Sequence, residues 1–304
     1  MRLSAYAAYA AALVAALAAG CSRAKIDRVE WPVMGTIAAV QLKGELTPGS
    51  GRFTADVMVA FNEVSDALNA HVATSEICSL APLADDEVLA KCADKMKPCY
   101  EAAFTLMRVS GGAFNPRWRG PKTLDLGAIA KGFAVDVAVE SVQNRKFAGL
   151  TGGSGVPPLQ GTESTPGPDV DILIDLGGNI KAAKGGWRTG VMDPRGGGFA
   201  AVVDLREGEA LATSATYYRG SHIYDGRTGL AVSNGVESVT VLCRSAMWAD
   251  GLSTTLFVLG PDEGRTFVEE KGKLLTGGEN VAVLWILSDG NCVKIDPEGR
   301  FSAK

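Results

Sequence analysis

The order of the apolar patterns along the chain constrains its fold more than any other feature. Helical spacing dominates the first half, at residues 55–70, roughly 98–109 and 128–145, and β-like runs dominate the second, at 170–175, 187–192, 199–205 and 236–243. A further helix is expected at about 246–259, stopped by Gly260 and Pro261. Because helices and strands do not alternate, the pattern predicts an α+β fold with mixed or antiparallel sheets and packed helices.

The ends of the chain suggest a division into three parts. A strand is expected at 33–42, and a terminal hairpin is expected from 281–287 and 292–296. Residues 149–169 are rich in Gly, Pro, Ser and Thr, which predicts an exposed loop. We therefore expect a signal peptide at 1–20, a tether at 21–32 and one folded domain at 33–304.

The N-terminal segment has the features of a secretory signal. Residues 1–20 carry one charge, Arg2, and an alanine-rich apolar run that is short for a membrane span. The run ends in Leu-Ala-Ala-Gly-Cys, which resembles a bacterial lipobox with Cys21 as the lipidated residue. The alternative is a plain signal peptide that happens to precede a cysteine. The lipoprotein interpretation predicts a periplasmic or other extracytoplasmic domain, lipid-anchored to a bacterial membrane.

Charge and residue counts exclude several functions. The chain of 304 residues has 34 acidic and 30 basic side chains, so it lacks the basic surface that a nucleic-acid partner requires. Its two histidines, His71 and His222, exclude HExxH zinc chemistry and any multi-histidine metal site. Beyond Cys21, Cys92 and Cys99 could form a disulfide with Cys78 as a competitor, or the thiols could be inert.

Two segments point to phosphate and metal chemistry. In Leu124–Gly132, Asp125 and a glycine precede a predicted helix start and Lys131 lies on its first turn, an arrangement that attracts anions. Asp250 and Thr254 lie on one face of the predicted helix at i and i+4, where a carboxylate and a hydroxyl could bind Mg²⁺. The plain alternatives are a helix cap with a solvated lysine, and a polar helix face.

Two further segments are candidates of a weaker kind. His222 stands in Ser221–Gly229, and it is one of the two imidazoles available as a general base near neutral pH. Asp175–Asn179 carries paired glycines after an apolar run, which allow a close backbone approach to a ligand or simply a tight turn. The chain has no GxGxxG after a strand and no GxxxxGK[ST], so standard dinucleotide and P-loop sites are unsupported.

Six segments in sequence order resemble the FAD:protein FMN transferase (ApbE) family. They are Met34–Thr36, Gly112–Pro116, Leu124–Gly132, Leu173–Ile180, His222–Gly229 and Ala249–Gly260. The resemblance implies an ApbE-like fold and Mg²⁺-dependent transfer of FMN from FAD to a Thr or Ser hydroxyl of an acceptor protein, with release of AMP. The acceptors implied are extracytoplasmic subunits of Na⁺-translocating NADH:quinone reductase or Rnf complexes.

The resemblance also implies roles for individual residues. Asp250, Thr254 and the backbone carbonyl of Ala128 would bind Mg²⁺, and His222 would deprotonate the acceptor hydroxyl. FAD would be held by Met34, Ala113, Phe114, Asn115, Asp125, Lys131 and Ile223. Two alternatives use the same site: a Mg²⁺-dependent FAD pyrophosphatase that gives FMN and AMP, and a non-catalytic flavin-binding lipoprotein.

The chain departs from the family pattern in several of these segments. Asn115 and Arg117 stand in a segment that is usually Phe-Asp-Pro-Thr, and Tyr224 and Gly226 stand where the family usually has Ile and Pro. The stretch between Pro116 and Leu124 is much shorter than usual. We therefore expect part of the FAD-binding wall to be missing or rebuilt.

Overall fold

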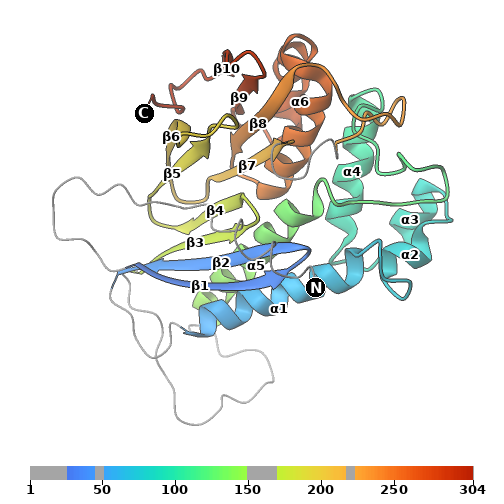
Figure 1. Cartoon of the computed structure of the whole chain (residues 1–304). Helices are drawn as coiled ribbons and strands as arrows, with labels where there is room; N and C mark the ends of the chain where they lie inside the picture. Colours follow the sequence, from blue (N-terminus) through green and yellow to red (C-terminus); the bar gives the residue numbers. More distant parts are fainter. Residues whose placement is uncertain (1–25, 45–50, 149–169, 217–222, 304) are drawn as a thin grey trace, which may run out of the picture.

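An antiparallel sheet organises the part of the chain that the computed structural model describes, residues 26–44, 51–148, 170–216 and 223–303 (Figure 1). Its eight strands lie in the order β1-β2-β3-β4-β7-β8-β9-β10. Their bounds are β1 Ile26–Val33, β2 Thr36–Lys43, β3 Asp171–Leu176, β4 Asn179–Lys184, β7 Ala210–Ala215, β8 Val236–Cys243, β9 Ala282–Leu287 and β10 Cys292–Ile295. The predicted signal peptide, Cys21, the loop 149–169 and His222 lie outside the described residues.

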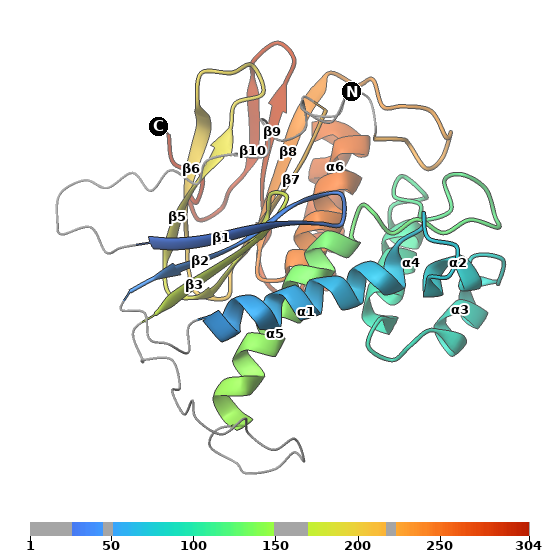
Figure 2. The same ribbon diagram turned by 60° about the horizontal axis from the view of Figure 1, so that its bottom comes forward.

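The sheet is covered by helices on one face and by a small second sheet on the other (Figure 2). The helices are α1 Gly51–Leu68, α2 Glu76–Leu80, α3 Asp85–Lys91, α4 Lys97–Val109, α5 Ala130–Ala148, α6 Ala246–Phe267 and α7 Lys273–Leu275, and a π-helical turn, Val268–Gly272, joins the last two. The second sheet pairs β5 Trp187–Met192 with β6 Phe199–Leu205.

Alternation along the strands divides the core between these two layers. On β3, Ile172 and Ile174 pack among the helices, whereas Leu173 packs with the β5–β6 layer. Successive side chains of a strand point to opposite faces, so one short apolar run supplies both cores. The α+β prediction with antiparallel sheets is confirmed.

The predicted tether requires a correction. Residues 26–32, together with Val33, form β1, which pairs residue by residue with β2 from Ile26↔Lys43 to Val33↔Thr36. β1 is an edge strand, so its charged side chains and Pro32 can face solvent without breaking a central ladder. A strand of this composition reads like a polar linker in the sequence. It is tolerated here because only one edge of β1 has to pair.

The break at Gly260 is confirmed, with one addition. Gly260 has a φ of 72°, which interrupts the regular helix, and a second helical segment then starts at Pro261 and runs to Phe267. Proline fits the first turn of a helix because its missing N–H has no intrahelical acceptor there. The sequence therefore marked a kink between two helical segments, and the chain stays helical beyond it.

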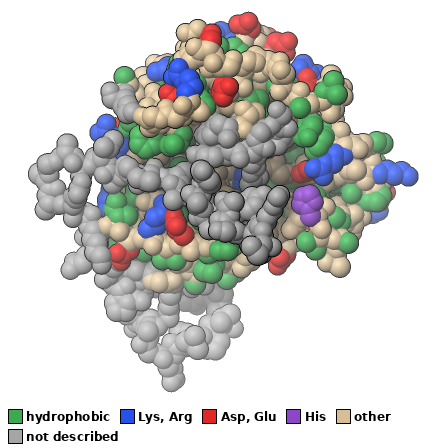
Figure 3. All heavy atoms as spheres, viewed as in Figure 1, with side chains coloured by type: hydrophobic (Ala, Val, Ile, Leu, Met, Phe, Trp, Pro, Cys, Tyr) green, Lys and Arg blue, Asp and Glu red, His purple; other side chains and the backbone are tan. Residues whose placement is uncertain are grey.

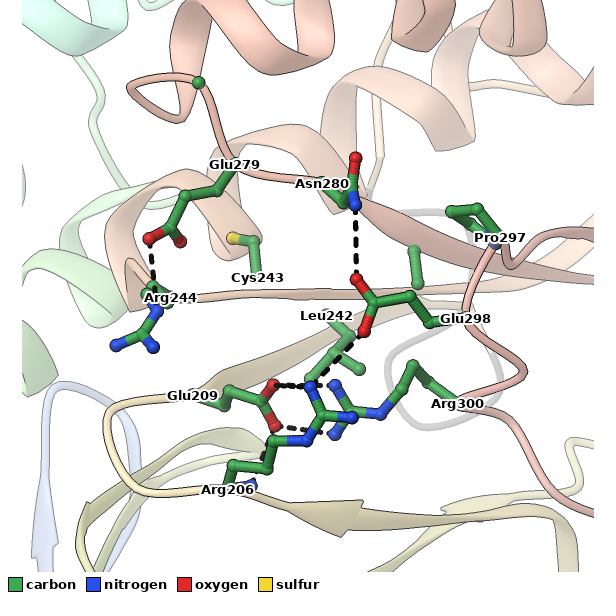
Figure 4. A pocket seen from close by; sticks show the side chains of 12 residues that line it. Arg206, Glu209, Leu242, Cys243, Arg244, Glu279, Asn280, Pro297, Glu298 and Arg300 are labelled. Carbon is green, nitrogen blue, oxygen red and sulfur yellow. Dashed lines mark hydrogen bonds and ion pairs between the residues drawn. The ribbon is translucent and has the colours of Figure 1, made fainter.

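A charged cavity of about 310 Å³ lies where the C-terminal segment meets β7 and β8 (Figure 4). Glu209 accepts hydrogen bonds from Arg300 at 2.6 and 2.7 Å, Arg206 pairs with Glu298 at 3.3 Å, and Arg244 pairs with Glu279 at 3.1 Å. Burial alone would raise the pKa of Glu209, but its hydrogen bonds from Arg300 and from the Arg206 amide lower it. The carboxylates lining this cavity are each paired with an arginine, and the pairs that include Glu298 and Arg300 hold the C-terminal segment against the sheet.

Candidate active site

The first turns of α5 and α6 meet at Gly132. A Cβ atom at this position would overlap the backbone carbonyl of Ala246 and the Cβ of Asp250, so only glycine permits so close an approach. Glycine is a poor residue inside a helix, and its presence here is explained by this contact. The two helix starts, which are over a hundred residues apart in the chain, are thereby brought into direct contact.

Asp250 lies at the centre of this contact and is 4% exposed. Its Oδ2 accepts a hydrogen bond from the Gly132 amide at 3.0 Å, and both carboxylate oxygens lie 3.4 Å from Lys131 Nζ. Lys131 also donates to the carbonyl of Gly127 at 3.1 Å. The structure therefore brings together Asp250 and Lys131, two of the residues that the sequence singled out.

The same contact alters the start of α5. In a regular helix the amide of Gly132 would donate to the carbonyl of Ala128, four residues earlier. Here that amide donates to Asp250 instead, although the i to i−4 bonds on either side form, from Ala130 to Leu126 at 2.8 Å and from Phe133 to Ile129 at 3.0 Å. The carbonyl of Ala128 therefore does not receive the hydrogen bond that the Gly132 amide would give it in a regular helix, because that amide bonds to Asp250. A carbonyl oxygen in this position is suited to bind a cation.

Thr254 lies in a group of hydroxyls between α6 and β7. Ser214 Oγ lies 3.0 Å from Thr254 Oγ1 and 2.8 Å from Ser253 Oγ, and Ser253 also donates to the carbonyl of Asp250 at 2.9 Å. Sequence reasoning found Thr254 but missed Ser214 and Ser253. The i, i+3 spacing of Asp250 and Ser253 was a visible signal, whereas only the packing of β7 on α6 reveals Ser214.

The donor set at the helix starts fits a magnesium ion that is shared with phosphate. It offers the carboxylate of Asp250 and the carbonyl of Ala128, and the hydroxyls of Ser253 and Thr254 follow about one turn further along α6; all of these are hard oxygen donors. Within the described ranges there is no group of three or more His, Cys, Asp or Glu side chains that could form a metal cage by themselves. Mg²⁺ commonly uses only one or two protein carboxylates and takes its other ligands from phosphate and water.

Asp136 is a positioning residue that the sequence did not indicate. Its carboxylate accepts hydrogen bonds from the amides of Ala246 and Met247 and from Ser245 Oγ, and Lys181 contacts it at 2.7 Å. A carboxylate at a helix N-terminus satisfies free amides and complements the helix dipole. Asp136, on the second turn of α5, therefore fixes where α6 begins and so where Asp250 points.

A continuous series of contacts links the other candidate residues to this centre. Asp125 Oδ1 accepts from the Gly127 amide at 2.9 Å, and the Asp125 amide donates to the carbonyl of Pro116 at 2.8 Å. Asn115 Nδ2 donates to the carbonyl of Gly226 at 3.1 Å, so the turn that follows Ile223 also contacts this series. The side chains of three candidates are in the core, so Ala113, Phe114 and Ile223 could contact a ligand chiefly through their backbone.

Met34 lies in a second corner, formed by two hairpin turns. Met34 and Gly35 both have positive φ, 49° and 68°, as the two-residue turn between β1 and β2 requires. Met34 is the one non-glycine with positive φ in the described part of the chain. The neighbouring β3–β4 turn needs Gly177 because a Cβ there would overlap Thr36, so the paired glycines serve a tight turn and packing between the two hairpins.

Asp175 precedes that second turn and is a buried acid. Its Oδ1 accepts from the Gly178 amide at 2.9 Å, yet burial raises the pKa of the carboxyl to about 6. Folding therefore favours the protonated form. The stabilisation is present below the unfolded pKa near 4 and is lost as the pH rises through about 6.

We expect Asp175→Asn to stabilise the protein at pH 7.5 but much less at pH 4.5. A shift of this size corresponds to about 3 kcal/mol of unfolding free energy between the two extremes of protonation, and the neutral amide can still accept from Gly178. Thermal melts at both pH values test this. Asp204→Asn is the control, because that side chain is 74% exposed, and an equal effect of Asp175→Asn at both pH values would contradict the assignment.

Two buried cysteines lie near the helix starts: Asp250 acts electrostatically on Cys99, and Cys243 Sγ donates to the carbonyl of Ser245 at 3.2 Å. The five described cysteines are free, so Cys92 and Cys99 do not pair and the inert-thiol alternative holds for them. Burial raises the pKa of the Cys99 and Cys243 thiols, the latter to about 12, which keeps both protonated. The histidine visible in Figure 3 is the exposed His71, since His222 is outside the described residues.

Comparison with known proteins supports the resemblance found in the sequence. The ApbE family model matches residues 170–276. An FAD:protein FMN transferase from Vibrio cholerae is 33% identical over 161 residues, covering 48% of this chain and 41% of the relative, and one from Rhodobacter capsulatus is 34% identical over 185 residues, covering 58% and 30%. The chain thus spans less than half the length of these two curated relatives.

Solved structures extend the similarity to most of the fold. The flavin transferase ApbE from Vibrio cholerae superposes with a TM-score of 0.67 at 21% identity, covering 92% of this chain and 97% of that one. The ApbE protein from Thermotoga maritima gives 0.68 at 18% identity, covering 92% and 100%. The fold and the paired helix starts define an α+β protein with a candidate site for a phosphate-bearing ligand. The resemblance to the ApbE family is confirmed by these matches, and the fold is the ApbE fold.

Proposed function

We propose that this chain is an FAD:protein FMN transferase that moves FMN from FAD to a Thr or Ser hydroxyl of an acceptor protein and releases AMP. The observation that carries the proposal is the contact between the starts of α5 and α6, where Lys131 and Asp250 lie 3.4 Å apart. A cation and a carboxylate at the start of α5, where the carbonyl of Ala128 has lost its helical bond from Gly132, form a site suited to a metal-bound diphosphate. The names of the relatives and the ApbE fold support a transferase.

Each residue has a proposed task in this reaction. Asp250, Thr254 and the Ala128 carbonyl would hold Mg²⁺, which when bound neutralises charge on the pyrophosphate. Lys131 binds a phosphate oxygen, and Asp125 orders the segment before the helix. His222 accepts the proton of the acceptor hydroxyl. The hydroxyl oxygen then forms a bond to the FMN phosphorus, and the bond from that phosphorus to the oxygen of the AMP phosphate breaks.

The setting of the reaction is also a proposal. Cys21 would carry a lipid anchor and place the domain on the periplasmic or other extracytoplasmic face of a bacterial membrane, where subunits of Na⁺-translocating NADH:quinone reductase or Rnf complexes would be the acceptors. The described helices include none that is both long and apolar enough to span a bilayer.

One assay tests the function. The purified full-length chain is incubated with FAD, MgCl₂ and a soluble acceptor domain from one of these complexes. Fluorescent acceptor on a denaturing gel, together with AMP in solution, is the expected result. Free FMN and AMP without a labelled acceptor would instead identify a pyrophosphatase, and unchanged FAD would identify a flavin-binding protein.

His222→Ala should lower transfer about 100-fold or more while FAD binding survives, because only general-base assistance is removed. Fluorescent labelling of the acceptor gives the rate, and fluorescence titration gives the FAD affinity. The matched control is His71→Ala, which removes the other imidazole from an exposed position. Transfer at the parental rate by His222→Ala would exclude this histidine as the base.

A further inference from the structure

A chain of three hydroxyls connects strand β7 to helix α6 beside the candidate metal ligands. Ser214 Oγ, on β7, lies 2.8 Å from Ser253 Oγ and 3.0 Å from Thr254 Oγ1, both on α6. Ser253 also donates to the carbonyl of Asp250 at 2.9 Å. The three hydroxyls therefore form one continuous series that ends on the backbone of the residue proposed to bind Mg²⁺.

The alternation of β7 directs Ser214 toward the helices. Ala212 packs in the core on the helix side of the sheet, and Leu211 packs in the core on the other side. Because successive side chains of a strand point to opposite faces, Ser214 shares the helix side with Ala212. Thr213 points the other way and its hydroxyl lies 2.8 Å from that of Thr240. β7 thus carries a hydroxyl on each face, and the one that contacts α6 belongs to Ser214.

Counting protons gives the direction of each bond in this series, because a hydroxyl has only one proton to donate. The proton of Ser253 lies on the carbonyl of Asp250, so Ser214 must donate to Ser253. The proton of Ser214 is then used as well, so Thr254 must donate to Ser214. The series runs from Thr254 to a backbone carbonyl, which can only accept. Thr254 Oγ1 is therefore a donor here and keeps its lone pairs for another partner.

This arrangement differs from that of an ordinary hydroxyl inside a helix. The hydroxyl of Thr255 donates to the carbonyl of Gly251, four residues earlier, at 2.8 Å. The corresponding acceptor for Thr254 is the carbonyl of Asp250, which already accepts from a side chain. Ser214 supplies an acceptor on the strand instead. Without it, the Thr254 hydroxyl would compete for the Asp250 carbonyl and lose its fixed orientation.

We propose that Ser214 is a positioning residue of the metal site, which accepts the Thr254 proton and so holds Oγ1 ready to bind Mg²⁺ through a lone pair. The proposal rests on the proposed function, because it takes Thr254 as a ligand. A hydroxyl binds a hard cation through its oxygen, and a proton directed toward the cation would oppose binding. Side chains that orient a metal ligand typically change metal affinity by about 10- to 100-fold.

Metal titrations measure this role without turnover. Mn²⁺, which prefers the same oxygen ligands as Mg²⁺, is titrated into the full-length chain, and the electron paramagnetic resonance signal of the unbound ion gives the Kd. Ser214→Ala should raise the Kd about tenfold, and Ser214→Thr, which keeps the hydroxyl, should restore it to about the parental value. Thr213→Val is the matched control, because it removes a 2.8 Å hydroxyl contact from the other face of the same strand. It should leave the Kd unchanged.

A double-mutant cycle separates positioning from direct binding. Thr254→Val should itself raise the Kd for Mn²⁺. In that background Ser214→Ala should have no further effect, because Ser214 acts through the Thr254 hydroxyl. A further tenfold loss in the double variant, on the order of the loss expected for a ligand, would mean that Ser214 contacts the ion by itself and would overturn the positioning role.

The remaining outcomes separate this proposal from the function on which it rests. A parental Kd for a folded Ser214→Ala variant would overturn the role of Ser214 and leave the metal site standing. If that variant does not fold, Ser214→Cys takes its place, because a thiol is a weak acceptor, and a parental Kd would overturn the role equally. A parent that binds no Mn²⁺ would overturn the metal site and the positioning role together. Weaker Mn²⁺ binding by Ser214→Ala, in a chain whose parent labels no acceptor, would contradict the transfer reaction and support the positioning role.

Discussion

Asp250→Asn is expected to abolish Mg²⁺-dependent turnover, with a loss of about 100-fold or more in kcat. The substitution keeps the shape of the side chain, and the amide oxygen can still accept from Gly132. It removes the negative charge that faces Lys131 and that a divalent cation requires. Turnover measured as AMP release over a range of MgCl₂ concentrations should lose its dependence on the metal.

Asp262→Asn is the matched control for this experiment, because Asp262 lies on the second segment of α6 and is exposed. It should leave both the rate and the metal dependence unchanged. Thermal melts of both variants separate a catalytic loss from unfolding. Parental turnover with parental Mg²⁺ dependence in Asp250→Asn would remove Asp250 from the metal site.

Gly132→Ala is expected to destabilise the protein by about 3 kcal/mol and to inactivate it. Helix propensity alone predicts that Gly132→Ala would stabilise the protein, since alanine is favoured over glycine inside a helix by about 1 kcal/mol. Packing should prevail, because the added Cβ would overlap the carbonyl of Ala246, a backbone atom that cannot move without shifting α6. The shift would also break the bond from Gly132 to Asp250.

Urea unfolding of Gly132→Ala and of Gly51→Ala measures this difference. Gly51 begins α1 and has open space where its Cβ would be, so its substitution should change stability by less than about 1 kcal/mol. A more stable Gly132→Ala variant would mean that α5 and α6 do not meet as closely as described.

Local patterns predicted many elements well where the pattern was strong. The bounds of β5, β6 and β8 match the sequence expectation, and α4 begins at Lys97, one residue before the expected Pro98. The short, alanine-rich strands β4 and β7 were missed, because small residues carry little alternation. β1 was missed because an edge strand tolerates charges and proline.

The residues of the candidate site also fall into those that local patterns could predict and those that they could not. Lys131, Asp250 and Thr254 could be named from the sequence, because their spacing on helices and their family pattern are local features. Ser214 and Asp136 could not, since their roles depend on which face of a distant strand or helix packs against α6. The stacking of Trp118 on Tyr224 could not be predicted either, because these two residues come from segments that no local rule connects.

By itself the sequence determined the α+β order of elements, the break at Gly260 and the residue types capable of phosphate chemistry. These depend on interactions between neighbours along the chain, such as helical periodicity and turn geometry. Only the tertiary structure decided that Gly132 meets Asp250, which is 118 residues further along. That contact is made by the packing of two whole helices on one sheet, and its energy is spread over the many side chains that hold them there.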